Sequence, residues 1–150
     1  MKLNVTWQTK PFHELSVAEL YQILQLRTEV FVVEQNCIFQ ELDGKDSIAL
    51  HLCGTFENQI IAYCRLYKPS QYYDNASIGR VVVSPKFRNY KVGFELMNVA
   101  ILEIKKHFNE TKITIGAQKY LVKFYESLGF KVSSAMYLED GIEHVEMQKN

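Results

Sequence analysis

The chain has 150 residues, of which 47% are hydrophobic, and its 17 basic and 17 acidic residues leave a formal net charge of zero. This length and composition indicate one globular domain spanning residues 1–150. The balanced charge argues against a general nucleic-acid binder, and no apolar run or signal-peptide h-region indicates a membrane association. The three cysteines are odd in number and lack CxxC spacing, so we interpret them as reduced thiols of a cytoplasmic protein.

The first third of the chain predicts a strand followed by a helix. Residues 3–7 alternate between apolar and polar side chains, which is typical of a short strand. Ser16 and Glu19 have the spacing of a capping box at a helix start. Apolar residues then recur every three or four positions, so we expect the helix to run to about Val33.

Three acidic residues, Glu41, Asp43 and Asp46, surround a turn at Gly44. They could be oxygen ligands of a cation, but the ligand spacing of a calcium loop is absent. The four histidines are scattered and form no zinc-ligand cluster. The sequence therefore predicts no metal site.

The middle of the chain predicts a β-meander leading into a helix. Residues 49–55 and 59–67 are expected to form a hairpin, and a β-branched strand follows from Ser77. After Gly93 the apolar period becomes helical, through Met97, Ala100, Ile101, Ile104 and Phe108.

The last third predicts a strand at 112–117, a short helix ended by Gly129, and two closing strands at 131–137 and 144–148. The whole order is roughly β-α-β-β-β-α-β-α-β-β. This alternation predicts a single-domain α/β fold, with a mixed sheet flanked by helices.

The segment between the strand from Ser77 and its helix has the features of an anion site. The first N–H groups of a helix, here those of Val92 to Glu95, have no intrahelical partners and lie at the positive end of the helix dipole. Gly93 would allow a ligand to approach closely, and Arg88, Lys91 and Lys86 add positive charge. The alternative is an ordinary strand-to-helix connection with solvated basic side chains.

Two motifs resemble the GCN5-related N-acetyltransferase (GNAT) family. Residues 88–93 (RNYKVG) resemble its acyl-CoA loop, R/Q-x-x-G-x-G/A, except that Lys91 replaces a glycine and would be strained at positive φ. Residues 124–130 (FYESLGF) resemble the motif that closes the family core. Further matches over residues 26–35, at His51 and at 139–142 resemble the ElaA-like branch of that family.

The resemblance implies direct acetyl transfer from acetyl-CoA to an amine, without a covalent enzyme intermediate. It implies that Tyr125 protonates the leaving thiolate, which a phenol can do. Gln118 stands where many relatives have asparagine near the pantetheine arm. The implied acetyl-CoA-binding residues are Val81, Val82, Val83, Arg88, Asn89, Tyr90, Lys91, Val92, Gly93, Phe94, Gln118 and Tyr125.

The general base that removes the amine proton is less well defined. Some family members have a glutamate as the base early in the strand that precedes the acyl-CoA loop. The corresponding residue in this chain is Ser77, which cannot serve as a base. Glu34 and His51 are the candidates, and His144 is a poorer one. Each has a structural alternative: Glu34 could pair with Arg27 or Arg80, His51 could be a satisfied strand histidine, and a water chain could replace both.

The expected partners are acetyl-CoA and an amine acceptor, with neither nucleic acid nor membrane. The acceptor could be a small amine, an amino sugar, a peptide terminus or a protein lysine, and homodimer formation is left open. The main alternative function is an acyl-CoA-binding module without catalysis. A second alternative is a nucleic-acid binder that uses Lys86, Arg88, Lys91, Lys105 and Lys106. The zero net charge and the lack of a recognised nucleic-acid motif argue against it.

Overall fold

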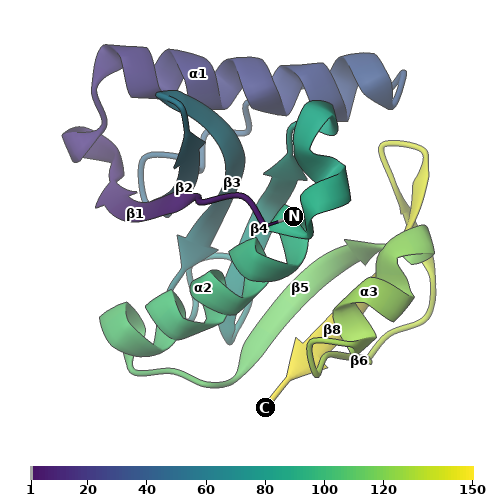
Figure 1. Ribbon diagram of the computed structural model, residues 1–150. Helices are drawn as coiled ribbons and strands as arrows, with labels where there is room; N and C mark the ends of the chain where they lie inside the picture. The colour runs from purple at the N-terminus through teal and green to yellow at the C-terminus, as the bar shows by residue number, and fades with distance from the viewer. Residues whose placement is uncertain (1) are drawn as a thin grey trace.

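The computed structural model describes residues 2–150 and contains one mixed sheet with helices on both faces (Figure 1). The strand order is β1-β2-β3-β4-β5-β8-β6, and β7 pairs with β8 on the edge opposite β5, as β6 does. Neighbouring strands are antiparallel except for β4 and β5, which are parallel. The predicted fold class is therefore confirmed. The strands are β1 (Thr6–Pro11), β2 (Leu50–Phe56), β3 (Gln59–Tyr67), β4 (Ala76–Val83), β5 (Ile113–Gln118), β6 (Lys131–Val132), β7 (Tyr137–Glu139) and β8 (Ile142–Lys149).

The helices form two layers around this sheet (Figure 1). On one face, α1 buries Ile23, Leu26 and the adjoining Val30 against side chains of β2, β3 and β4. On the other face, α2 and α3 cover the larger apolar core. The helical segments are α1 (Val17–Thr28), α2 (Val92–Phe108) and α3 (Val122–Glu126), with shorter turns η1 (Phe12–Glu14), η2 (Glu29–Glu34), η3 (Pro85–Tyr90) and η4 (Lys119–Leu121).

The first helix begins as predicted and ends in an unusual way. Ser16 Oγ accepts the Glu19 N–H at 3.0 Å, and Glu19 Oε1 accepts the Ser16 N–H at 2.8 Å, so the capping box is present. At its other end α1 continues into η2, a π-helical turn with a bond from the Gln35 N–H to the Val30 carbonyl at 3.2 Å. Such wide turns often occur at functional sites.

The boundaries at both ends of the sheet differ from the sequence predictions. The first strand is Thr6–Pro11 and not residues 3–7, since its pairing with β2 runs from Thr6 opposite Thr55 to Pro11 opposite Leu50. Proline is tolerated at the end of this strand because β1 lies at the edge of the sheet, where a missing N–H group costs no ladder bond. The predicted strand 131–137 is wrong. Only Lys131–Val132 and, separately, Tyr137–Glu139 pair with β8.

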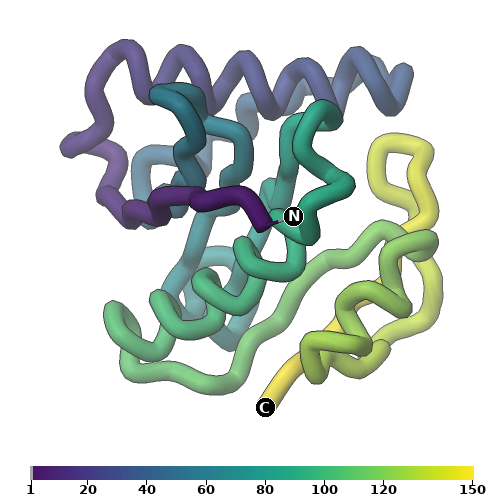
Figure 2. The backbone as a smooth tube through the Cα atoms, viewed as in Figure 1, coloured from purple at the N-terminus to yellow at the C-terminus, as the bar shows by residue number. Residues whose placement is uncertain are grey.

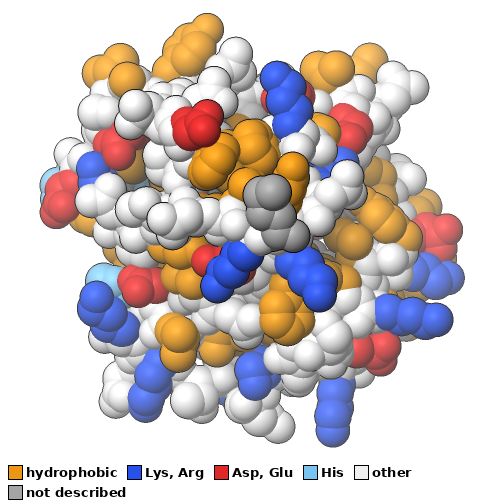
Figure 3. All heavy atoms as spheres, viewed as in Figure 1, with side chains coloured by type: hydrophobic (Ala, Val, Ile, Leu, Met, Phe, Trp, Pro, Cys, Tyr) orange, Lys and Arg blue, Asp and Glu red, His pale blue; other side chains and the backbone are white. Residues whose placement is uncertain are grey.

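The N-terminal strand lies beside the start of α2 (Figure 2), where Trp7 Nε1 donates a hydrogen bond to Glu95 Oε1 at 2.8 Å. On the surface drawn in Figure 3, basic side chains are interspersed with acidic and neutral ones. Within residues 2–150, no helix combines the length and the hydropathy needed to cross a bilayer.

Candidate active site

A cleft opens where β4 and β5 separate. The two strands pair only at Ala76 with Ile113 and at Ser77 with Thr114, after which β4 remains paired to β3 alone. A cavity of about 770 Å³ lies along the separated strands, and Ile78 to Val83 of β4 form one wall. Within the described part of the chain, the backbone edge of β4 that faces this cavity therefore has no strand partner beyond Ser77. Such an edge can bind an extended ligand through main-chain hydrogen bonds.

A bulge marks the point at which β4 diverges. The register with β3 shifts between Tyr63 and Arg65, and Arg80 has a φ of 50°. A non-glycine residue with such a positive φ costs about 1–3 kcal/mol, and it persists only where the surrounding contacts hold it. The Arg80 guanidinium binds both the carboxylate and, at 2.7 Å, the carbonyl oxygen of Glu41. The sequence analysis considered a pair between Arg80 and Glu34, and the structure corrects this because Arg80 pairs with Glu41.

The loop after β4 presents an anion site at the start of α2. Lys91 precedes the helix in the left-handed conformation, with φ 58° and ψ 26°, so the lysine adopts the positive φ that was expected to strain it. The Glu95 N–H donates to the Lys91 carbonyl at 3.2 Å, which leaves the N–H groups of Val92, Gly93 and Phe94 as the free helix-end donors. Among the ion pairs within residues 2–150, none uses Lys91. Lys91, Gly93 and Phe94 line the cavity, whereas Asn89, Tyr90 and Val92 do not.

Gly93 lies where the helix end meets the cleft. A Cβ atom at this position would lie 3.6 Å from Val83 Cγ2 and 3.8 Å from Phe124 Cζ, which are ordinary contacts. Its φ is also outside the range that favours glycine. Neither backbone conformation nor packing therefore demands glycine, and the space above it is available to a ligand.

Arg88 is held by an ion pair that the sequence analysis did not predict. Its guanidinium binds both carboxylate oxygens of Glu34, at 2.6 and 2.7 Å. The hydrogen bond from Arg88 lowers the pKa of Glu34, and the same bond raises the pKa of Arg88. Glu34 thus holds the loop arginine and is not among the cavity-lining residues, which argues against its expected role as a base.

Tyr125 lies on the opposite wall of the cleft and is 6% exposed. It packs edge-to-face against Phe124 and Phe130, and Gly129, in the turn that follows α3, has a φ of 97°. Burial raises the pKa of Tyr125 above its ordinary value, which keeps the phenol protonated. A protonated phenol at this position can donate a proton or a hydrogen bond into the cavity.

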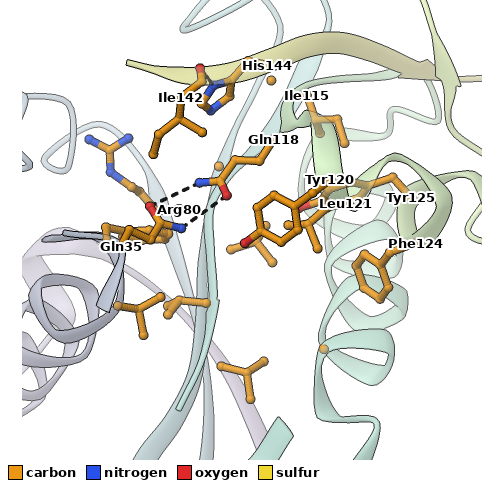
Figure 4. Close-up of a pocket in the computed structure, with 18 of the residues that line it drawn as sticks. Gln35, Arg80, Ile115, Gln118, Tyr120, Leu121, Phe124, Tyr125, Ile142 and His144 are labelled. Carbon is orange, nitrogen blue, oxygen red and sulfur yellow. Dashed lines mark hydrogen bonds between the residues drawn. The ribbon is translucent and has the colours of Figure 1, made fainter. Parts of the chain in front are cut away.

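A pair of amide side chains spans the cleft (Figure 4). Gln35 Nε2 donates to Gln118 Oε1 at 3.2 Å, and Gln118 Nε2 donates to Gln35 Oε1 at 3.4 Å. The pair joins the end of the π-helical turn to the end of β5. It places both residues on the wall of the cavity, and Gln35 was not named as a site residue in the sequence analysis.

His51 is separate from the cleft. It is 1% exposed, and burial lowers its pKa. Nε2 bonds the Asp46 carbonyl oxygen at 2.8 Å, and Nδ1 bonds the Tyr63 hydroxyl at 2.6 Å. Because a carbonyl only accepts, Nε2 carries the proton and Nδ1 accepts from Tyr63. Both ring nitrogens are therefore occupied, and the expectation that His51 is a general base is corrected.

The acidic residues considered as cation ligands belong to a buried ion-pair cluster. Arg27 and Arg65 are at most 1% exposed, and Arg27 binds Glu41 and Asp46. Arg65 binds Asp43 and Asp46. This cluster of arginines and carboxylates fastens the loop before β2 to the sheet. Among residues 2–150, no group of three or more His, Cys, Asp or Glu side chains could hold a metal ion.

Sequence reasoning did not identify the wall of the cavity formed by β8, although it named one of its residues, His144, as a poorer candidate for the base. Ile142 and His144 project from β8, and Cys37 and Asp140 lie at the same end, where Cys37 Sγ donates to the Asp140 carbonyl at 3.2 Å. The alternation of Ile142 and His144 on one face of a strand was a usable signal. The sequence alone does not show which face of β8 turns toward the cleft.

Comparisons with known proteins agree with this geometry. Residues 16–150 match the family model described as an acetyltransferase (GNAT) domain. Protein ElaA of Escherichia coli is 40% identical over 97% of this chain and 96% of its own, and its crystal structure superposes with a TM-score of 0.91, covering 98% of this chain and 100% of that one. An acyl-CoA N-acyltransferase from Pseudomonas aeruginosa gives a TM-score of 0.92 at 38% identity, over 98% of this chain and all of that one. A GNAT acetyltransferase from Elizabethkingia anophelis with acetyl-CoA bound shares the fold alone, at 19% identity and a TM-score of 0.63 over 97% and 95% of the chains.

Proposed function

Because the chain belongs to the GNAT acetyltransferase family, we propose that it transfers the acetyl group of acetyl-CoA directly to the nitrogen of an amine. The observation that carries this proposal is the cleft between β4 and β5. It combines an unpaired strand edge, a helix N-terminus with free N–H groups and a buried phenol. These three features match the parts of one extended cosubstrate.

The pantetheine arm of acetyl-CoA contains amide groups that can pair with a strand. The backbone of Val81 to Val83 lines the cleft on the edge that lacks a partner strand. We place the arm along this edge, where its amides would take the hydrogen bonds that β5 makes with β4 at Ala76 and Ser77. Gln118, across the cleft, offers a further amide.

The pyrophosphate would lie against the start of α2. The N–H groups of Val92 to Phe94 and the helix dipole favour an anion there, and Lys91 adds an unpaired ammonium group within the described chain. Arg88 would exchange part of its contact with Glu34 for phosphate oxygens. Its bidentate geometry suits either partner.

Tyr125 would supply the proton for the departing CoA thiolate. A thiolate is a good leaving group since the thiol pKa is about 8.5, and a phenol can protonate it as the C–S bond breaks. The raised pKa of Tyr125 ensures that its hydroxyl carries this proton at neutral pH. The acceptor amine would attack the thioester carbon from the side of the cleft bounded by β8.

The first test is calorimetric titration of acetyl-CoA into the wild type and an Arg88→Ala, Lys91→Ala double variant. We expect micromolar binding by the wild type and at least tenfold weaker binding by the variant, because two phosphate contacts are lost. A Lys105→Ala, Lys106→Ala variant removes the same charge from the far end of α2 and should bind as the wild type does. A folded wild type that does not bind acetyl-CoA would contradict the proposal.

Turnover separates an enzyme from an acyl-CoA-binding module. Acetylation would be followed with a panel containing an alkyl amine, an amino sugar, a peptide with a free terminus and a lysine peptide. Tyr125→Phe should lower kcat by roughly 10²-fold while leaving acetyl-CoA affinity unchanged, because only the donated proton is lost. Tight binding without acetylation of any amine would favour the non-catalytic alternative.

A further inference from the structure

We infer that His144 accepts the proton that the acceptor amine loses, with Glu139 as the residue that positions and compensates it. This inference rests on the proposed transferase function. It concerns the end of the cleft opposite the phosphate loop, which is bounded by β7 and β8. The sequence analysis ranked His144 below Glu34 and His51 as a base, and both of those residues lie outside the cavity lining.

The hydrogen bonds of His144 fix its tautomer. Nδ1 lies 2.8 Å from the carbonyl oxygen of Ile142. Because a carbonyl only accepts, Nδ1 must donate, and the proton of the neutral ring is on this atom. Nε2 therefore has a free lone pair, unlike the nitrogens of His51, which are both occupied.

The ring is also held in place. Tyr137 stacks on it, with ring centroids 5.8 Å apart and an interplanar angle of 27°. The His144 side chain is 8% exposed and lines the cavity, and it projects from β8 on the side of Ile142 toward Gln118 and Arg80 (Figure 4). A buried, oriented imidazole with one free lone pair is suited to accept a proton from a bound amine.

Its surroundings suit the charged form that would result. Glu139 Oε2 is 3.6 Å from Nε2, close enough to stabilise an imidazolium. The Arg80 guanidinium on the facing wall is paired with the Glu41 carboxylate. Its positive charge therefore repels an imidazolium at His144 less than an unpaired arginine would. The other polar groups on the packed elements are Tyr137 of β7 and Gln118 of β5, which pairs with His144 in register, and both are uncharged at neutral pH.

The other cavity groups are unsuited to this step. Arg80 and Arg88 are guanidinium ions, Tyr125 has a raised pKa and is needed as the acid, and the Cys37 thiol is occupied with the Asp140 carbonyl. Imidazole is the side chain whose ordinary pKa lies between pH 5 and 8. His144 is thus the group in the cleft that offers a free lone pair to a proton of the amine.

His144 Nε2 takes one proton from the acceptor ammonium, and the free amine forms its bond to the thioester carbon. The tetrahedral intermediate then breaks its C–S bond as Tyr125 protonates the sulfur, and the nitrogen passes its remaining excess proton to the phenolate. His144 releases its proton to solvent, and the net products are the acetamide, CoA and one proton.

The test uses acetyl-CoA with phenethylamine as the probe amine, and amine-independent hydrolysis of acetyl-CoA as a second readout, since water attack needs the same base. We expect His144→Gln to lower kcat by at least about 100-fold with acetyl-CoA affinity within twofold of wild type. The acidic limb of the pH profile of kcat should disappear. Glu139→Gln should retain more activity and move that limb to lower pH, because the imidazolium loses its carboxylate. His107→Gln, an exposed histidine of α2 outside the cavity, is the control.

Wild-type kcat and an unchanged acidic limb in His144→Gln would overturn the inference and leave the transferase function standing. Failure of the wild type to bind acetyl-CoA would instead overturn the proposed function, and this inference with it. Binding without either acetylation or hydrolysis would overturn both. If His144→Gln does not fold, ¹⁵N NMR of the wild-type ring decides. Nε2 should be unprotonated at pH 8 and protonate at the midpoint of the acidic limb, and a different midpoint would contradict the inference.

Discussion

The chain gathers charged side chains in two places, and they differ in whether the charges are satisfied. In the buried cluster, Arg27 and Arg65 each bind two carboxylates, and the loop before β2 is closed over them. In the cleft, Lys91 has no ion pair among the described residues, and three helix-end N–H groups lack partners. The first arrangement stabilises the fold, and the second is available to a ligand. Charge density alone therefore does not identify the site.

Removing one member of the cluster should have the largest effect. Arg27→Met would leave the Glu41 and Asp46 carboxylates buried without one of their cations. Breaking a buried ion pair in this way costs about 3–5 kcal/mol, so we expect the free energy of unfolding in urea to fall by that amount. Arg88→Met, which breaks an exposed pair, should cost less than about 1 kcal/mol. Equal losses in the two variants would contradict the distinction between the regions.

Acid should unfold the protein through the same cluster. Burial alone would raise the pKa of Asp43 and of Asp46, but hydrogen bonds from Arg65 and Arg27 outweigh it and lower both below the ordinary value of 3.8. A lowered pKa in the folded state stabilises the protein above pH 3.8, and this stability is lost as the pH falls further. Each additional proton bound by the unfolded chain costs about 1.4 kcal/mol per pH unit. Urea unfolding between pH 6 and 2.5 should therefore show a decline that Asp43→Asn reduces, and an unchanged slope in this variant would contradict the assignment.

In the cleft, Gly93→Ala should affect binding and leave stability intact. The added Cβ makes only ordinary contacts with Val83 and Phe124, and alanine favours the helix. We expect the melting temperature to be equal or higher, and acetyl-CoA affinity to fall about tenfold because the methyl group occupies ligand space.

Gly54→Ala is the matched control for this change. Its Cβ would lie 2.5 Å from Trp7 Cζ3, so it should lower stability while affinity at the distant cleft is kept. If Gly93→Ala bound acetyl-CoA like the wild type, the phosphate position on the α2 N-terminus would be wrong.

The same contrast explains how far sequence reasoning reached. The loop and the short helix with Tyr125 could be predicted because their residues are contiguous and carry their own signals, such as a β-branched strand, a glycine and a helical period. These are local properties of the chain.

The side-chain partners could not be predicted, because they join segments far apart in sequence. Glu34 was expected to pair with Arg27 or Arg80 but binds Arg88, 54 positions away. His51 and His144 both lie in strands, and nothing local shows that one faces a closed cluster and the other the cleft. The bulge at Arg80 depends in turn on Glu41, which belongs to another loop.

The smallest expected effect concerns the exposed ion pair between Arg88 and Glu34. Glu34→Gln would remove the charge that holds Arg88 and free its guanidinium for phosphate. Because the pair is about 40% exposed and screened by solvent, we expect acetyl-CoA to bind only two- to threefold more tightly at low salt, with the gain lost at 0.5 M salt.

The control for this change is Glu143→Gln, which removes the same charge from the exposed Lys119–Glu143 pair of β8 and should leave affinity unchanged. Weaker binding in Glu34→Gln would show that Glu34 orients Arg88 for the ligand and does not compete with it. The loop would then resemble the buried cluster, in which carboxylates position the arginines. The two regions would differ in how far their ion pairs are buried, and not in the role of the carboxylates.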